Sequence, residues 1–157
     1  FLRKKVVRGV ITKKEWTKLQ NVDKQNTLFV RQTIEKHGWP TFDLIGKRAS
    51  QSFWLLVQHA DKNLKLQKRC LELLRVVVEN GQASPKNLAY LIDRILTSEN
   101  KKQIYGSQYS RVGNKLVPKP IKDKKKVNKL RKEVGLEPLG TATKSINKEC
   151  QGYLKKK

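Results

Sequence analysis

The chain holds two histidines, His37 and His59, and each stands where a helical pattern ends. His59 is followed two residues later by Asp61, and a carboxylate at that distance in a turn can orient an imidazole ring for general acid or base work. An imidazolium is also stabilised by the carbonyl groups at a helix C-terminus, so each histidine could equally be a simple helix cap. The spacing leaves both interpretations open.

Arg94 and Tyr105 complete a set that could act on RNA. Cleavage of RNA without a metal needs a base for the 2′-hydroxyl, an acid for the leaving oxygen and cationic donors for the phosphate. Arg94 could clamp a phosphate with its planar guanidinium, although spacing alone favours an ordinary ion pair. The predicted catalytic residues are His59, His37, Asp61, Arg94 and Tyr105. The predicted substrate-binding residues are Gln58, Gln103, Ser107, Gln108, Trp39, Lys124, Lys125 and Lys126.

Several other kinds of site and segment are excluded by the sequence. It has no phosphate-binding P-loop, no dinucleotide-binding glycine run, no nucleophile elbow and no His-Glu-x-x-His motif. Cys70 and Cys150 are too few for a thiolate metal site, and carboxylates do not cluster, so we expect neither a metal nor a cofactor. The longest apolar runs are far shorter than the roughly 20 residues of a membrane span, so no transmembrane helix is expected.

The positive charge is concentrated at the two ends of the chain. Of 157 residues, 36 are Lys or Arg and 13 are Asp or Glu, which gives a net charge of +23. Residues 1–20 carry +6, from seven basic and one acidic side chain, and residues 101–157 carry +13, from 17 basic and four acidic ones. An excess of this size favours a polyanionic partner, and nucleic acid is the leading candidate. Solubilising tails are the simpler alternative.

These candidate residues must be positioned by helices. Apolar spacing of three to four residues predicts helices at about 22–36, 47–60 and 63–80, and Ser84-Pro85 is a start signal for a fourth. Gly38 and Gly81 are expected to end the first and third helices. A Gly113-Asn114 turn predicts a short β-hairpin, and a basic helix is expected at 124–134.

The expected fold is mainly α: a compact, bundle-like helical domain with a short β-hairpin and basic terminal extensions. Its predicted parts are a basic N-terminal extension at 1–21, a helical domain at 22–140 and a basic C-terminal tail at 141–157. The chain opens at Phe1 and contains no methionine. This start favours a processed product or the end of a longer polypeptide, and we expect a secreted or delivered bacterial effector that acts in the cytoplasm.

Four polar motifs carry a family resemblance: HGWP at 37–40, QHAD at 58–61, AYLIDR at 89–94 and QIYGSQ at 103–108. Together with Gly46, Gln67 and the segment 120–136, they resemble an uncharacterised bacterial family known only as a domain of unknown function. The similarity covers about residues 22–140. It implies a compact, mostly helical domain whose polar motifs face a common pocket, and it assigns no activity.

Two functions from different classes fit these observations, and we prefer the first. In the first, the chain is a metal-independent ribonuclease, a toxin or effector domain whose basic surface binds RNA and is masked by an acidic immunity or inhibitor protein. In the second, it is a non-catalytic nucleic-acid-binding or ribonucleoprotein structural module. A weaker alternative is an enzyme that acts on a small nucleotide with the same residues.

Overall fold

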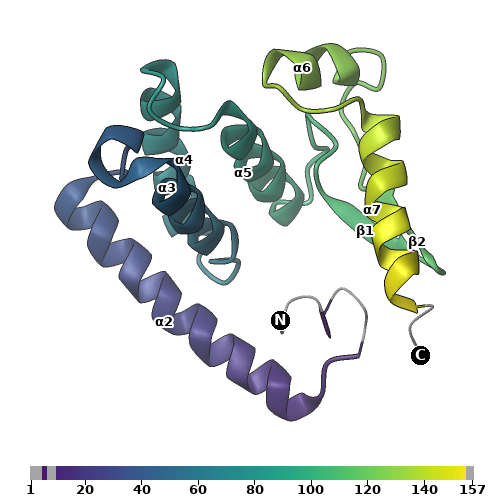
Figure 1. Ribbon diagram of the computed structural model, residues 1–157, viewed down its shortest axis with the longest axis horizontal. Helices are drawn as coiled ribbons and strands as arrows, with labels where there is room; N and C mark the ends of the chain where they lie inside the picture. The colour runs from purple at the N-terminus through teal and green to yellow at the C-terminus, as the bar shows by residue number, and fades with distance from the viewer. Residues whose placement is uncertain (1–4, 7–9, 155–157) are drawn as a thin grey trace.

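A computed structural model describes residues 5–6 and 10–154, and the fold in this part of the chain is mainly α with one short hairpin (Figure 1). The basic residues at 1–4, 7–9 and 155–157, which belong to the predicted extensions, lie outside the described residues. The elements are α2 (Lys13–His37), α3 (Phe42–Gln58), α4 (Leu64–Glu79), α5 (Pro85–Ser98), β1 (Tyr109–Val112), β2 (Lys115–Pro118), α6 (Val127–Glu133) and α7 (Leu139–Leu154).

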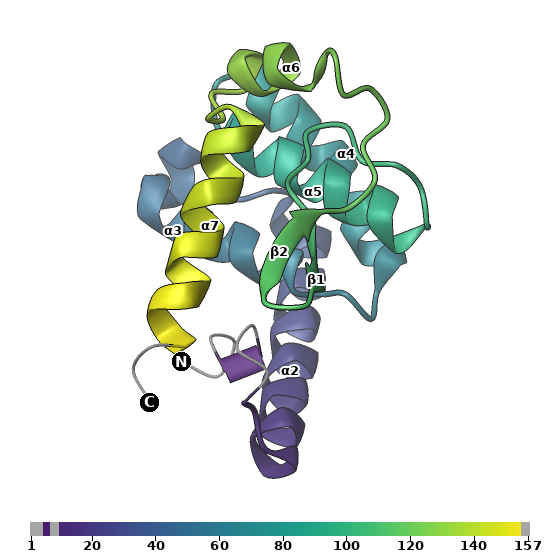
Figure 2. The same ribbon diagram turned by 90° about the vertical axis from the view of Figure 1, so that its right-hand side faces the viewer.

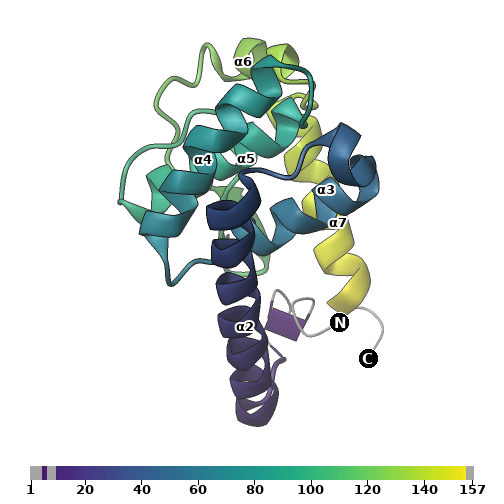
Figure 3. The ribbon, with the colours of Figure 1, turned by 90° about the vertical axis from the view of Figure 1, so that its left-hand side faces the viewer.

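Helix α2 is much longer than its apolar pattern suggests. It begins at Lys13 instead of near residue 22, because Thr12 and Glu15 form a capping box in which the Thr12 side chain accepts a hydrogen bond from the Glu15 backbone. The predicted boundary at 21–22 therefore falls inside α2. The helix ends as expected at Gly38, whose N–H bonds to the Ile34 carbonyl. Its N-terminal half projects beyond the other helices (Figure 3).

Helices α2 to α5 share one hydrophobic core. Their inward residues fall at helical spacing, and burial of such side chains removes apolar area from water. The core residues are Val30, Ile34, Trp39, Phe53, Trp54, Val57, Leu66, Cys70, Leu74, Ala83, Leu91 and Ile95. Helix α3 is interrupted at Gly46, which has a φ of 76°. Burial raises the pKa of the Cys70 thiol to about 12, which makes this cysteine a packing residue at neutral pH.

The C-terminal third forms a second layer beside α5 (Figure 2). Strands β1 and β2 pair in antiparallel register, with Val112 opposite Lys115 across the predicted Gly113-Asn114 turn. Helix α7 packs on β2, where the Asn147 side chain accepts from the Leu116 N–H and donates to the Leu116 carbonyl, both at 2.8 Å. The predicted polar tail from residue 141 is therefore continuous with a regular helix.

No helix in the described part of the chain combines the length and the apolar character that a membrane crossing needs.

Candidate functional site

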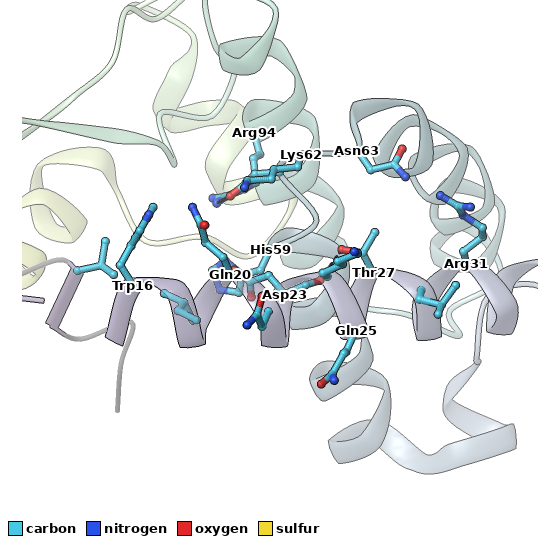
Figure 4. Close-up of a pocket in the computed structure, with 16 residues that line it drawn as sticks. Trp16, Gln20, Asp23, Gln25, Thr27, Arg31, His59, Lys62, Asn63 and Arg94 are labelled. Atoms are coloured by element: carbon cyan, nitrogen blue, oxygen red, sulfur yellow. Dashed lines mark hydrogen bonds and ion pairs between the residues drawn. The ribbon is translucent and has the colours of Figure 1, made fainter. Parts of the chain in front are cut away.

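A groove of about 1300 Å³ lies between α2 and the turn that joins α3 to α4. In Figure 4, α2 forms one wall, with Trp16 toward one end and Arg31 toward the other, and His59 lies between them. Lys62, Asn63 and Arg94 form the opposite wall. Four basic and two acidic side chains line the groove: Lys24, Arg31, Lys62, Arg94, Asp23 and Asp61.

His59 is held at the C-terminal end of α3. Its backbone N–H donates to the Leu55 and Leu56 carbonyls at 3.2 and 3.1 Å, and its side chain is half-buried in the groove. The turn that follows is closed by Asn63, whose side chain accepts from the Leu66 N–H and so caps α4. A rigid turn between two capped helices fixes the position of the imidazole ring.

Asp61 and Arg94 form a bidentate ion pair that ties this turn to α5. Arg94 Nε lies 2.6 Å from Asp61 Oδ1, and Nη2 lies 2.7 Å from Oδ2. Burial alone would raise the pKa of the Asp61 carboxyl, but the Arg94 guanidinium and the neighbouring His59 outweigh it and hold that pKa below its usual value. Arg94 therefore forms an ion pair, but its partner is Asp61, 33 positions earlier in the chain, and not a neighbour of Asp93.

Arg94 also reaches the loop at 103–108. Its Nη1 donates to Gln108 Oε1 at 3.2 Å, and Gln108 Nε2 donates in turn to Ser107 Oγ at 3.2 Å. One chain of hydrogen bonds thus connects Asp61, Arg94, Gln108 and Ser107. The predicted binding residues Ser107 and Gln108 stand behind the groove wall and stabilise it.

The residue next to Arg94 has a different role. Asp93 is fully buried, and its carboxylate accepts hydrogen bonds from the backbone N–H groups of Ile104, Tyr105 and Ser107 at 2.7 to 3.0 Å. Gln103, also fully buried, donates to the carbonyls of Gln108 and Lys119 and accepts from the Gln108 N–H. These contacts shape the loop from within.

Arg131 completes this buried arrangement, which we call the Asp93 anchor: Asp93, Gln103, Arg131 and the loop at 103–108. Arg131 is 2% exposed and donates to the carbonyls of Tyr105 at 2.6 Å and Glu137 at 2.5 Å. Gly106 is required within the loop, because its φ is 69° and an added Cβ would lie 2.7 Å from Leu139 Cδ1. Partial burial and the charge of Asp93 raise the pKa of the Tyr105 hydroxyl.

The predicted site residues therefore separate into groups. His59, Asp61 and Arg94 line the groove together, whereas Tyr105 and Gln103 belong to the Asp93 anchor. His37 is exposed at the end of α2 and does not line the groove. Among the described residues, no group of three His, Cys, Asp or Glu side chains is arranged to hold a metal ion.

The other predicted binding residues do not line the groove: some lie in the core and the rest lie on the surface near α6. Gln58 is 4% exposed and Trp39 is 5% exposed, with the Trp39 ring packed edge-on against Phe53 at 5.4 Å between centroids. Lys124, Lys125 and Lys126 are exposed in the turn before α6. The Asp123 carboxylate shapes that turn by accepting from the backbone N–H groups of Lys125 and Lys126.

The wall of the groove on α2 is the part that sequence reasoning missed. Trp16, Gln20, Lys24 and Arg31 are spaced by multiples of three to four residues, so they share one helix face. The signal that could have revealed them is the Thr12-x-x-Glu15 capping box, which marks a helix start at residue 13. A helix that begins at residue 13 places Trp16 and Gln20 on the same face as Lys24.

Comparison with known proteins identifies the chain only at the level of a family. No curated protein and no solved structure matches it. The model of one family matches residues 10–155, which includes the whole of α2 and the whole of α7. This range is wider at both ends than the resemblance inferred from the polar motifs. The chain belongs to the family of unknown function DUF6624.

Proposed function

We propose that this protein is a metal-independent ribonuclease and that His59 transfers the proton in the groove between α2 and the α3–α4 turn. The observation that carries the proposal is the position of His59: a half-buried imidazole in a groove that four basic side chains line. Imidazole is the side chain whose ordinary pKa suits proton transfer at neutral pH. The cationic lining would attract the RNA backbone.

The reaction that fits these residues is an internal transphosphorylation. Neutral His59 removes the proton from a 2′-hydroxyl, and the 2′-oxygen attacks the adjacent phosphorus. The bond between phosphorus and the 5′-oxygen breaks, and the leaving oxygen takes a proton from the Lys62 ammonium or from water. The products are a 2′,3′-cyclic phosphate and a 5′-hydroxyl. Lys24, next to Asp23 on α2, would offset the charge that builds up on the phosphate.

Asp61 and Arg94 support this chemistry by holding the turn that carries His59. Their bidentate bonds at 2.6 and 2.7 Å already occupy two guanidinium nitrogens, so we give Arg94 a positioning role instead of a phosphate-clamping one. His37 and Tyr105 are left out of the proposed mechanism, since neither lines the groove. The proposed catalytic set is therefore smaller than the set predicted from the sequence.

The two histidines provide a matched test. Wild-type protein, H59Q and H37Q are incubated with RNA in excess EDTA, and the fragments are separated on a gel. We expect H59Q to lose at least a hundredfold in cleavage rate, the usual contribution of a general base, while H37Q cleaves like wild type. The cyclic phosphate ends can be identified by mass spectrometry. RNA that stays intact with wild-type protein, or equal cleavage by H59Q, would refute the proposal.

A second candidate is non-catalytic RNA binding, and the basic surface of α6 favours it. Lysines 124, 125, 126, 129 and 132 are exposed on α6 and the turn before it, away from any proposed chemistry. Phosphate contacts release counterions, so each lost contact should lower the slope of log K against log salt by about 0.7–0.9. An acidic inhibitor protein would be complementary in charge to the same lysines.

The triple variant K124Q/K125Q/K126Q tests this surface. We expect its RNA affinity to show a salt slope smaller by about two to three than that of wild type. A slope that does not change would remove this surface from the RNA interface. If wild-type protein binds RNA with the expected salt dependence and leaves it intact, the second candidate replaces the first.

A further inference from the structure

We infer that the groove takes single-stranded RNA, with one nucleobase stacked on Trp16. This inference rests on the proposed function and adds to it the kind of RNA and the residue that holds a base. It starts from a contrast among the three tryptophans. Trp39 and Trp54 are 5% and 7% exposed in the core, whereas Trp16 is 43% exposed on α2.

Trp16 lies on the wall of the groove that faces the His59 side (Figure 4). A large aromatic side chain left accessible in a groove is a favourable surface for stacking, because every nucleobase has a flat π-face. Val6, Leu19 and Leu28 also line the groove, so much of its surface is apolar. Apolar walls suit bases that have been turned out of a helix better than they suit a phosphate backbone.

The spacing along α2 matches a strand that runs past His59. With a rise of 1.5 Å per residue, Trp16 lies about 10 Å along the helix axis from Asp23, which lines the groove beside His59. Arg31 lies about 22 Å from Trp16 on the same axis. Successive phosphates of one stacked strand advance by about 3.4 Å, so this length accommodates roughly six stacked nucleotides and fewer extended ones.

The charges of the groove fit a backbone threaded between these ends. Lys24 and Arg31 on α2 and Lys62 on the opposite wall can contact phosphates. Asp61 also faces the groove, but its charge is balanced by Arg94. Asp23 is the second acidic residue there, and with four basic side chains the lining keeps a positive excess. A duplex would hide the faces of its bases, so it could not use Trp16.

The test uses tryptophan fluorescence and an oligonucleotide that cannot be cleaved. A 2′-O-methyl RNA 8-mer lacks the attacking hydroxyl, so the wild-type protein can be titrated at equilibrium. Stacking on Trp16 should quench the exposed part of the emission. Inorganic polyphosphate of equal charge should bind without quenching. We also expect a duplex of the same length to bind less tightly than the single strand.

Variants at two exposed aromatic positions of α2 complete the design. W16L should lose the quenching and about tenfold in affinity, and W16F should retain most of the affinity. F29L is the matched control: Phe29 is 54% exposed on the same helix but does not line the groove, so its loss should leave RNA affinity unchanged. Circular dichroism of each variant confirms that α2 is intact.

The outcomes separate this inference from the proposed function. Cleavage by wild-type protein, with W16L binding and cleaving equally well, would overturn the Trp16 subsite and leave the ribonuclease in place. Equal affinity for duplex and single strand, or quenching by polyphosphate, would do the same. A wild-type protein that neither binds nor cleaves any RNA would overturn both proposals.

Discussion

Asp61 and Asp93 are both carboxylates that join α5 to a loop or turn, yet their surroundings are opposite. The Asp61 side chain is 49% exposed and pairs with one guanidinium at the edge of the groove. Asp93 is 0% exposed and accepts from three backbone N–H groups. A buried carboxylate without partners would cost several kcal/mol, so the backbone around Asp93 must adopt one conformation. The exposed pair is under no such constraint.

The comparison shows that neighbours in a motif can face different parts of the molecule. Asp93 and Arg94 are consecutive on α5, and successive side chains of a helix point about 100° apart. Asp93 therefore bonds to the loop at 103–108, while Arg94 bonds to Asp61 at the groove. Polar residues that occur together in a family-like motif need not share a pocket. In this chain, Asp93 stabilises the loop at 103–108, and Arg94 stabilises the wall of the candidate site.

The largest expected effect is the loss of the Asp93 carboxylate. D93A leaves three backbone donors without their acceptor, so we expect a loss of about 3–5 kcal/mol in the free energy of unfolding, measured by urea denaturation. D93N retains one acceptor oxygen and should lose less. A D93A protein as stable as wild type would contradict the role of the anchor.

Removal of the Arg131 guanidinium should come next. R131M keeps much of the side-chain volume but leaves the carbonyls of Tyr105 and Glu137 without their donor. We expect a loss of about 2–3 kcal/mol in unfolding free energy, with faster hydrogen exchange at residues 103–108. R48M, at an arginine that is exposed on α3, is the control and should change the stability much less. Equal effects of the two substitutions would argue against a specific role for Arg131.

The Asp61–Arg94 pair should contribute little to stability, and its contribution should depend on pH. D61N is expected to lose less than about 1 kcal/mol at pH 7, since half of the Asp61 side chain is in water. The folded pKa of Asp61 lies below its usual value of 3.8, so the stabilisation is present above that pH and is lost as the pH falls through the folded pKa.

Urea denaturation of wild type and D61N at pH 7 and at pH below 3.8 checks this sign. The difference between the two proteins should be largest at neutral pH and should disappear in acid. A difference that grows on acidification would mean that the carboxyl is stabilised in its protonated form. D61N should also slow RNA cleavage, and by more than its small loss of stability would explain, because it releases the turn that carries His59.

The smallest effect is expected at His37. This side chain is exposed in the last turn of α2 and lies outside the groove, so H37Q should change the unfolding free energy by no more than about 0.5 kcal/mol. Thermal unfolding followed by circular dichroism measures it. A large loss of stability would contradict a merely exposed position of His37 at the end of α2.

The elements that sequence reasoning predicted well are those with local signals. Ser84-Pro85 marks the start of α5, and Gly113-Asn114 marks the hairpin turn, because a proline or a turn glycine acts within a few residues. The same reasoning missed the first nine residues of α2 and the regular helix α7. Both segments have weak apolar patterns because they bury few side chains. The start of α2 projects beyond the other helices, and α7 packs mainly on β2 and α6. His59 and Asp61 were found together because they are close in sequence.

By itself, the sequence determined the helical class, the hairpin and the positive charge, since propensity, turn chemistry and composition act locally or add up along the chain. The tertiary structure decided which polar residues meet. It paired Asp61 with Arg94 across 33 positions, enclosed Asp93 among the backbone donors of a distant loop, and placed Trp16 and His59 in one groove. Such pairings depend on how α2, α3 and α5 pack, and packing depends on the whole core at once.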